Sequence, residues 1–214
     1  MEESKEILEL KESQRFFKKE YPLKFPHYYA YTVKQARVDG LWLEFGVWTG
    51  TSAKIITLLM EAYGHDKKLY GFDSFQGLPE DWQDPITGEI QKEGKKGFFS
   101  LNGYVPKPPN DSVVYVKGWF DKTLPIFTKD FEGPVAFLHI DCDLYSSTKT
   151  VFDNLEDRIV PGTVIMFDEI HGYPGHQAHE LKAFQEFVEK TKAQYQWIGH
   201  VSDGRQASLI ITNR

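Results

Sequence analysis

The sequence predicts an α/β protein built on a doubly wound, mostly parallel sheet of seven strands that ends in an antiparallel hairpin. The first observation is alternation: short runs of apolar, β-branched and aromatic residues recur along the chain, with helical patterns between most of them. The second is the spacing of the last two runs, because only residues 202–205 separate them, too few for a crossover helix. Strands alternating with helices favour an open parallel sheet with helices on both faces.

Several of the predicted strands are apolar almost throughout, which is typical of strands covered on both faces. In chain order the seven strands span residues 41–47, 68–73, 113–118, 135–141, 163–169, 195–201 and 206–212. Helical spacing of apolar residues predicts four helices between them, at residues 51–63, 121–129, 146–159 and 176–192. Pro125 interrupts the second of these helices, and Pro161-Gly162 ends the third.

Two segments lie outside this predicted core. Residues 1–38 are predicted to form an N-terminal helical extension, two helices broken at Pro22 and Pro26, ahead of the main domain at residues 39–214. This extension could cover a site, pack on the sheet or make a homo-oligomer contact such as a dimer, and the sequence leaves all three open. Residues 84–112 are rich in glycine and proline, and a connection of this length predicts a functional lid or a mobile loop.

The composition is that of one globular domain. Of 214 residues, 41% are hydrophobic and 26% charged, which excludes disordered, collagenous and coiled-coil proteins. Lys and Arg number 25 against 31 Asp and Glu, a net charge of −6, so we expect no bulk nucleic-acid partner. We predict a cytoplasmic protein from the single cysteine, Cys142, and from an acidic N-terminus without a secretory signal. Because no apolar run reaches 18 residues, we also expect that the protein does not span a membrane.

The first predicted strand runs through a glycine-containing turn into a helix. Gly46 and Gly50 allow the backbone to approach a ligand closely, and the helix start offers free amides to an anion. A turn without any ligand is equally consistent with this spacing. Neither G-x-G-x-x-G nor G-x-x-x-x-G-K-[ST] is present. Asp73 ends the second strand 23 positions after Gly50, near the offset at which a carboxylate binds ribose hydroxyls, so the two features together favour a nucleoside without a pyrophosphate site.

Acidic residues follow two further strands. Asp141 and Asp143 come after the fourth strand, and Asp168 and Glu169 after the fifth. Four unpaired carboxylates at one edge of the sheet would repel one another and raise each other's pKa, so the cluster favours either a cation among them or a role for one of them as a base. Oxygen ligands suit Mg²⁺, Mn²⁺ or Ca²⁺. Asp143 could instead cap the next helix, and Glu169 could be merely solvated.

Two histidines near this edge are candidate bases. His139 shares a strand face with Asp141 but could equally be a core histidine, and His171 follows the fifth strand but could be a loop residue without a role. Cys142 lacks a patterned partner for nucleophilic catalysis and no G-x-S-x-G motif is present, so acyl transfer is unsupported.

Five segments carry a resemblance to a known family: LEFGVWTGTS, YGFDSFQGLPEDW, VKGWFDKTLP, LHIDCDLYSSTKTVFDNL and PGTVIMFDE. They occur in the same order as in class I S-adenosylmethionine (SAM)-dependent methyltransferases, which have a Rossmann-like fold. Within this class the chain resembles the macrocin O-methyltransferase (TylF) type, whose members methylate sugar hydroxyls. The resemblance covers about residues 40–213, and its most specific part is I-D-x-D-L-Y-x-S-T followed by P-G-x-x-x-x-x-D.

The resemblance implies SAM as cofactor, S-adenosylhomocysteine (SAH) as product, and Mg²⁺ or a similar divalent cation. The cofactor-binding residues it implies are Glu44, Gly46, Trp48, Thr49, Gly50, Thr51, Ser52, Asp73, Ser74, Phe75, Gly118, Trp119, Asp141 and Tyr145. In this set the turn lies at the methionine end, Asp73 at the ribose and Trp119 near the adenine. The implied metal ligands are Asp141, Asp168 and Glu169, with Asp141 also a candidate base. The family commonly has two aspartates where this chain has Asp168-Glu169, which puts Glu169 as a direct ligand in doubt.

We therefore expect a metal-assisted O-methyltransferase acting on a hydroxyl of a sugar or related small molecule. Such a hydroxyl is protonated at neutral pH, so a metal and a carboxylate base would both assist its attack. Three alternatives stay open: metal-independent methyl transfer with Asp141, His139 or His171 as base, a SAM-binding protein without catalysis and, more distantly, a nicotinamide dehydrogenase. Lysines 92, 95 and 96 in the lid indicate either an anionic acceptor or only a solvated loop.

Overall fold

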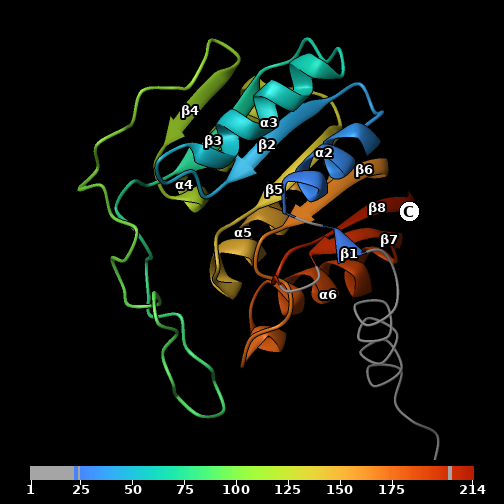
Figure 1. Cartoon of the computed structure of the whole chain (residues 1–214). Helices are drawn as coiled ribbons and strands as arrows, with labels where there is room; N and C mark the ends of the chain where they lie inside the picture. Colours follow the sequence, from blue (N-terminus) through green and yellow to red (C-terminus); the bar gives the residue numbers. More distant parts are fainter. Residues whose placement is uncertain (1–21, 24, 202–203) are drawn as a thin grey trace, which may run out of the picture.

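The computed structural model describes residues 22–23, 25–201 and 204–214, and they form one mixed sheet with helices on both faces (Figure 1). The strands are β1 (Pro22–Leu23), β2 (Leu41–Phe45), β3 (Leu69–Asp73), β4 (Val113–Lys117), β5 (Val135–Ile140), β6 (Ile159–Phe167), β7 (Gln194–Val201) and β8 (Ala207–Asn213). The helices are α2 (Phe25–Gln35), α3 (Thr51–Ala62), α4 (Phe120–Asp130), α5 (Tyr145–Leu155) and α6 (Glu180–Thr191), with two short 3₁₀ helices, η1 (Glu156–Arg158) and η2 (His176–Ala178).

The strand order in the described sheet is β1-β7-β8-β6-β5-β2-β3-β4. Strands β2 to β6 are parallel to one another where they pair, and β8 is antiparallel to both β6 and β7. The predicted fold class, with seven strands and a terminal antiparallel hairpin, is therefore confirmed. The eighth strand, β1, was not predicted: it adds two residues parallel to the edge strand β7.

Alternating side chains of each central strand bury into one of two hydrophobic layers. Leu43 and Leu138 point into a layer built with α4, α5 and α6, whereas their neighbours Trp42 and Phe137 point into a layer built with α2 and α3. Residues in a strand alternate between faces, so apolar residues at consecutive positions are what a sheet covered on both sides requires.

Several predicted element boundaries are wrong. Pro26 does not break a helix, because α2 begins at Phe25 and places Pro26 in its first turn, where the missing N–H would have no helical partner. Helix α4 likewise continues through Pro125, although a proline inside a helix lacks the N–H for one helical hydrogen bond and crowds the preceding turn. The helix predicted at 146–159 ends earlier, since Ile159 already pairs with Val135 and Pro161-Gly162 lies within β6.

The helix predicted over residues 176–192 is divided, with η2 first and α6 starting only at Glu180. The first helix of the predicted extension lies outside the described residues, as does most of the segment considered for a dimer contact. Among the described residues no helix is long and apolar enough to cross a membrane.

The connection from β3 to β4 is a long loop. Figure 1 shows it extending away from the sheet, and the residues from 84 to 112 contain no helix or strand apart from one isolated bridge at Gln83–Ile90. Backbone hydrogen bonds hold its base: Trp82 N donates to Gly94 O at 2.6 Å, and Gly97 N donates to Leu78 O at 2.9 Å.

The chain reverses its direction of travel across the sheet between β2 and β5. From β2 it proceeds outward to β3 and β4, and from β5 it proceeds the other way to β6. The carboxyl ends of β2, β3, β5 and β6 therefore meet around one crevice, the place where open α/β sheets bind ligands.

Candidate functional site

A cavity of about 830 Å³ occupies this crevice. Its walls come from the segments after β2, β3, β5 and β6, the start of α4, and the long loop. Its lining residues include Gly46, Trp48, Asp73, Ser74, Trp82, Gln91, Lys92, Glu93, Phe99, Trp119, Lys122, Asp141, Asp143, Ser146, Asp168, Glu169 and Arg205. The volume lies within the range of small-molecule sites in proteins.

Asp73 holds the glycine turn in place. Its Oδ2 accepts hydrogen bonds from the backbone amides of Val47 at 2.9 Å and Trp48 at 2.8 Å, and its Oδ1 accepts one from Phe75 N at 2.6 Å. Charged acceptors make stronger hydrogen bonds than neutral ones, so this carboxylate ties the turn after β2 to the loop after β3. The glycine turn also leaves the side chain of Trp48 exposed: it is 48% accessible and lines the cavity.

Gly46 lets the backbone of the turn lie directly against the segment after β5. Its φ is +92°, and a Cβ here would be 2.7 Å from the carbonyl carbon of Asp141 and closer still to its oxygen. Its amide donates to Phe72 O at 3.0 Å. No side chain other than hydrogen fits this position without displacing the backbone that carries Asp141.

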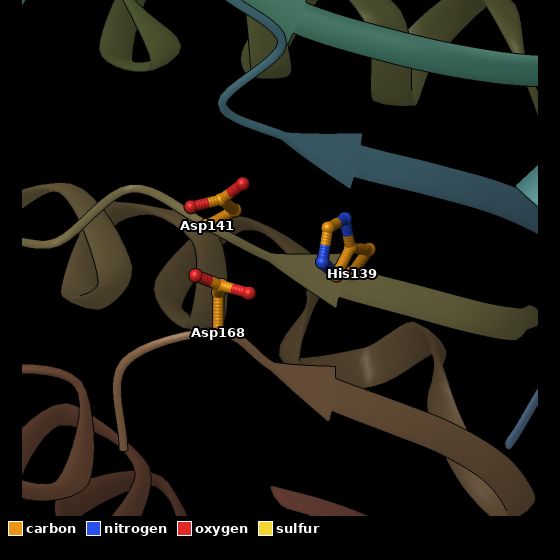
Figure 2. Close-up of side chains that lie close together, drawn as sticks. All are labelled: His139, Asp141 and Asp168. Carbon is orange, nitrogen blue, oxygen red and sulfur yellow. The ribbon is translucent and has the colours of Figure 1, made fainter. Parts of the chain in front are cut away.

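Asp141 and Asp168 lie side by side because ladder hydrogen bonds continue past the strands that precede them. Asp141 N donates to Phe45 O, and Asp168 N donates to Ile140 O, both at 2.9 Å. One ligand atom each from His139, Asp141 and Asp168 lies within 4.8 Å of the others, an arrangement that could hold a metal ion (Figure 2). Glu169 lines the same cavity but is not a member of this cluster.

His139 forms the floor of the cluster. It is fully buried, and its Nδ1 lies 3.1 Å from Oε1 of Glu44, which is also fully buried and pairs with it across the β2–β5 ladder. Within the described structure, Nε2 of His139 and Oε2 of Glu44 have no hydrogen-bond partner.

Burial and mutual repulsion favour the protonated form of the carboxyl groups around the cluster. Burial, followed by the charge of Asp168, raises the pKa of Asp143 to about 7 and that of Glu169 to about 8. The same two causes raise the pKa of Asp141 well above its usual range. Such a site gains stability from any cation that can replace the protons.

Two residues before β8 contact the acidic residues after β6. Gln206 Nε2 donates to Asp168 Oδ1 at 3.1 Å, and Arg205 Nη1 donates to Glu169 Oε2 at 3.1 Å. Neither was recognised in the sequence. The predicted hairpin was the available signal for these two residues, because they precede its second strand, β8. Since β8 runs antiparallel to β6, it starts where β6 ends, with Ala207 paired to Phe167.

Glu180 is a third residue of the site that was not recognised in the sequence. It is fully buried in the first turn of α6, and its two carboxylate oxygens accept hydrogen bonds from Cys142 N at 3.4 Å and Glu169 N at 3.3 Å. One side chain thus contacts both segments that carry the acidic residues. Its place at the start of a helical pattern carries no signal of this role.

Of the site residues expected from the sequence, one group lines the cavity: Gly46, Trp48, Asp73, Ser74, Trp119, Asp141, Asp168 and Glu169. The others do not belong to its lining: Glu44, Thr49, Gly50, Thr51, Ser52, Phe75, Gly118, His139, Tyr145 and His171. His171 has Nε2 3.4 Å from Gln206 O, and burial lowers its pKa to about 4. The hydroxyl of Tyr145 donates to Glu186 at 2.9 Å.

The long loop contributes an aromatic and a polar wall. The rings of Phe99 and Trp48 meet edge to face with centroids 5.5 Å apart. Of the three lysines noted in the sequence, only Lys92 lines the cavity, while Lys95 pairs with Asp81 at 3.3 Å.

A family model described as Macrocin-O-methyltransferase (TylF) matches residues 24–200 of the chain. Over 167 residues the chain is 29% identical to the 8-demethyl-8-(2,3-dimethoxy-alpha-L-rhamnosyl)-tetracenomycin-C 4'-O-methyltransferase of Streptomyces olivaceus. This match covers 67% of the chain and 61% of that relative. Over 150 residues it is 29% identical to the mycinamicin III 3''-O-methyltransferase of Micromonospora griseorubida, a match that covers 62% of the chain and 56% of that relative. The chain thus spans less than two thirds of the length of these relatives.

Two solved structures have a similar fold. The calicheamicin methyltransferase CalS11 matches with a TM-score of 0.68 at 18% identity, covering 98% of this chain and 94% of that one. The O-methyltransferase NovP matches with a TM-score of 0.63 at 22% identity, covering 88% and 79%.

Proposed function

The chain belongs to the macrocin O-methyltransferase (TylF) family, and from this premise we propose that it transfers the methyl group of SAM to a hydroxyl of a sugar or glycosylated small molecule, assisted by a divalent cation. The observation that carries the proposal is a single cavity bounded by the glycine turn, by Asp73 and by the acidic cluster.

The residues present fit the nucleoside and amino-acid ends of SAM. Helix α3 starts after Gly50 without a side-chain cap, so its first amides are available to a carboxylate. Asp73 lines the cavity at the end of β3, where a ribose would lie in this fold, and Trp119 offers a partly exposed ring at the start of α4. The acidic cavity also favours a cationic sulfonium electrostatically.

The cluster fits a divalent cation. Asp141 and Asp168 offer oxygen ligands that converge on one point, and the orphaned Nε2 of His139 is aimed at the same place. A cation bound there would supply Lewis acidity that lowers the pKa of the acceptor hydroxyl. Glu169 lines the cavity beside this point, and the guanidinium of Arg205 that donates to it balances part of the local negative charge.

The protein has two carboxyl groups suited to accept the proton of the acceptor hydroxyl. Asp141 lines the cavity and is one of the three candidate bases expected from the sequence, with His139 and His171. Asp143 also lines the cavity, two residues after Asp141. His171 lies outside the lining, which makes it a weaker candidate.

The proposed acceptor would enter beside the long loop. Trp82 and Phe99 give this side of the cavity apolar faces, and Gln91, Lys92 and Glu93 give it hydrogen-bonding groups. Aromatic faces with a few polar groups suit a sugar ring carrying hydroxyls.

The experiment is methyl transfer from isotope-labelled SAM to a panel of free sugars, nucleotide sugars and glycosylated natural products, followed by mass spectrometry. We expect SAM-dependent gain of one methyl group on at least one sugar-containing acceptor, abolished by chelator and restored by a divalent cation. Turnover that is unaffected by exhaustive chelation would refute the metal-assisted part, and SAH binding without turnover on any acceptor would favour a binding protein without catalysis.

A further inference from the structure

We propose that Glu180 is a positioning residue: it fixes the carbonyl side of both Asp141 and Asp168 and thereby sets the spacing of their carboxylates. This inference rests on the divalent cation of the proposed function and deepens it. It starts from a fully buried carboxyl group at the beginning of α6 that lies outside the cavity lining and has no part in the proposed reaction.

The sheet holds the two aspartates only on their amino side. The amide of Asp141 donates to Phe45 O at 2.9 Å. The amide of Asp168 donates to Ile140 O, also at 2.9 Å. Strands β5 and β6 end at Ile140 and Phe167, directly before the stretches that carry these residues. The peptide unit that follows each aspartate therefore needs another support.

Glu180 supplies this support for both aspartates. Its Oε1 accepts a hydrogen bond from the amide of Cys142 at 3.4 Å, and its Oε2 accepts one from the amide of Glu169 at 3.3 Å. Each of these amides shares a planar peptide unit with the carbonyl group of the preceding aspartate. The direction of a side chain follows from its own N, Cα and carbonyl carbon. One carboxyl group thus fixes the directions of Asp141 and Asp168 relative to each other.

The start of α6 is a rigid support for this side chain. Leu181 and Phe184 follow Glu180 along the helix and are buried in the hydrophobic core. His179, directly before it, lies with Nε2 2.9 Å from Gln83 O, and the ring donates because a carbonyl oxygen only accepts. Contacts on both sides of Glu180 therefore hold it in place, which a residue that orients others requires.

The stability of the fold does not explain a carboxyl group at this position. Burial, followed by the charges of three neighbouring acidic residues, raises the pKa of Glu180 well above its usual range. Buried charged groups often add nothing to stability compared with uncharged residues of similar volume. Glu180→Gln keeps the volume and one acceptor oxygen but turns an NH₂ group toward one of the two amides. This variant separates the stability of the fold from the spacing of the aspartates.

The test measures binding of Mg²⁺ and of SAH to the full chain by calorimetry, without acceptor. We expect Glu180→Gln to weaken Mg²⁺ binding by about 10–100-fold, the loss typical when a residue that orients metal ligands is changed. SAH affinity and the urea midpoint of unfolding in chelator should not fall. Unchanged Mg²⁺ affinity would overturn the proposal. Parallel losses of Mg²⁺ affinity, SAH affinity and the urea midpoint would also overturn it, because they would indicate a general structural role.

Glu186→Gln is the matched control. Glu186 lies on the same helix and accepts a hydrogen bond from the hydroxyl of Tyr145 at 2.9 Å, so it links α6 to α5 but not to the acidic segments. Mg²⁺ affinity should be unchanged in this variant. A loss as large as that in Glu180→Gln would overturn the specific role of Glu180, because any change in α6 would then disturb the site.

A measurement on the wild-type chain does not depend on the folding of a variant. Hydrogen exchange followed by NMR, in chelator, reports the amides of Cys142 and Glu169 directly. Both should exchange far more slowly than unstructured amides, because the buried side chain of Glu180 accepts from them. Exchange of both amides at the unprotected rate would overturn the proposal.

The same titrations separate this inference from the proposed function. Loss of Mg²⁺ affinity in Glu180→Gln, with no SAH binding to the wild-type chain, would refute the methyltransferase and leave the role of Glu180 standing. SAH binding with equal Mg²⁺ affinity in the wild-type chain and the variant would do the reverse. SAH binding without any Mg²⁺ binding to the wild-type chain would remove the cation from the proposed function and overturn this inference with it.

Discussion

Replacing Gly46 with alanine tests whether the glycine turn and the acidic segment are built as one unit. A left-handed conformation costs an L residue about 1–2 kcal/mol. Overpacking against a backbone that cannot move freely adds about 1–3 kcal/mol. The Cβ at position 46 would be 2.7 Å from the carbonyl carbon of Asp141, so both penalties apply. We expect Gly46→Ala to lower the free energy of unfolding by about 2–5 kcal/mol, the sum of these two ranges.

Gly64 provides the matched control, because it has a similar φ of +77° but nothing within 4 Å of a Cβ added there. Gly64→Ala carries only the conformational penalty, so the difference between the two variants isolates the clash and should be about 1–3 kcal/mol. Urea denaturation measures both free energies. Equal stability of the two variants would refute the close packing of the turn on Asp141, and unchanged SAH affinity in folded Gly46→Ala would refute its role in the site.

Three further predictions concern the cavity. Asp168→Asn should reduce turnover by about 100-fold or more, because it weakens cation binding, and should leave SAH affinity unchanged. Steady-state kinetics measures the turnover and calorimetry the SAH affinity, and the control Glu189→Gln on the exposed side of α6 should leave both unchanged. Lys92→Ala should raise KM for an anionic acceptor but not for a neutral one, with Lys107→Ala, outside the cavity lining, as control. In chelator, urea denaturation should show stability falling as pH rises from about 5 to 8, because burial raises the pKa of Glu169 to about 8, so the folded state binds a proton that the unfolded state has already released. Glu169→Gln should reduce this slope, and the remainder comes from groups such as Asp143, whose pKa burial raises to about 7.

The sequence predicted those parts of the fold that depend on local pattern. Apolar runs and helical spacing located the seven main strands, and a four-residue connection predicted the hairpin of β7 and β8. The errors fell where tertiary context decides. The short strand β1 exists because β7 offers it an edge, and Ile159 joins β6 because Val135 lies beside it. Prolines 26 and 125 were predicted to break helices, but Pro26 lies in the first turn of α2, where proline is tolerated, and α4 continues through Pro125.

The site was predictable where strand ends alone determine it. Asp73, Asp141 and Asp168 follow parallel strands, and the carboxyl ends of neighbouring parallel strands meet at one edge. The supporting residues depend on chain segments far apart in the sequence. Glu180 reaches both acidic segments from α6, and Arg205 and Gln206 reach them from the start of β8. The predicted hairpin located the start of β8, but no local pattern shows which distant groups these three side chains contact.

The most direct test of the account is whether the chain binds SAM, the first step of the proposed reaction. Thermal unfolding with SAM or SAH, with NAD⁺ as control, measures this binding. Ligand at about 100 times its dissociation constant should add about 2.7 kcal/mol of stability. For a chain of 214 residues this corresponds to a rise in Tm of about 5–10 °C. We expect that rise with SAM and with SAH and none with NAD⁺. No rise with either sulfur nucleoside at millimolar concentration would contradict the proposed function at its first step.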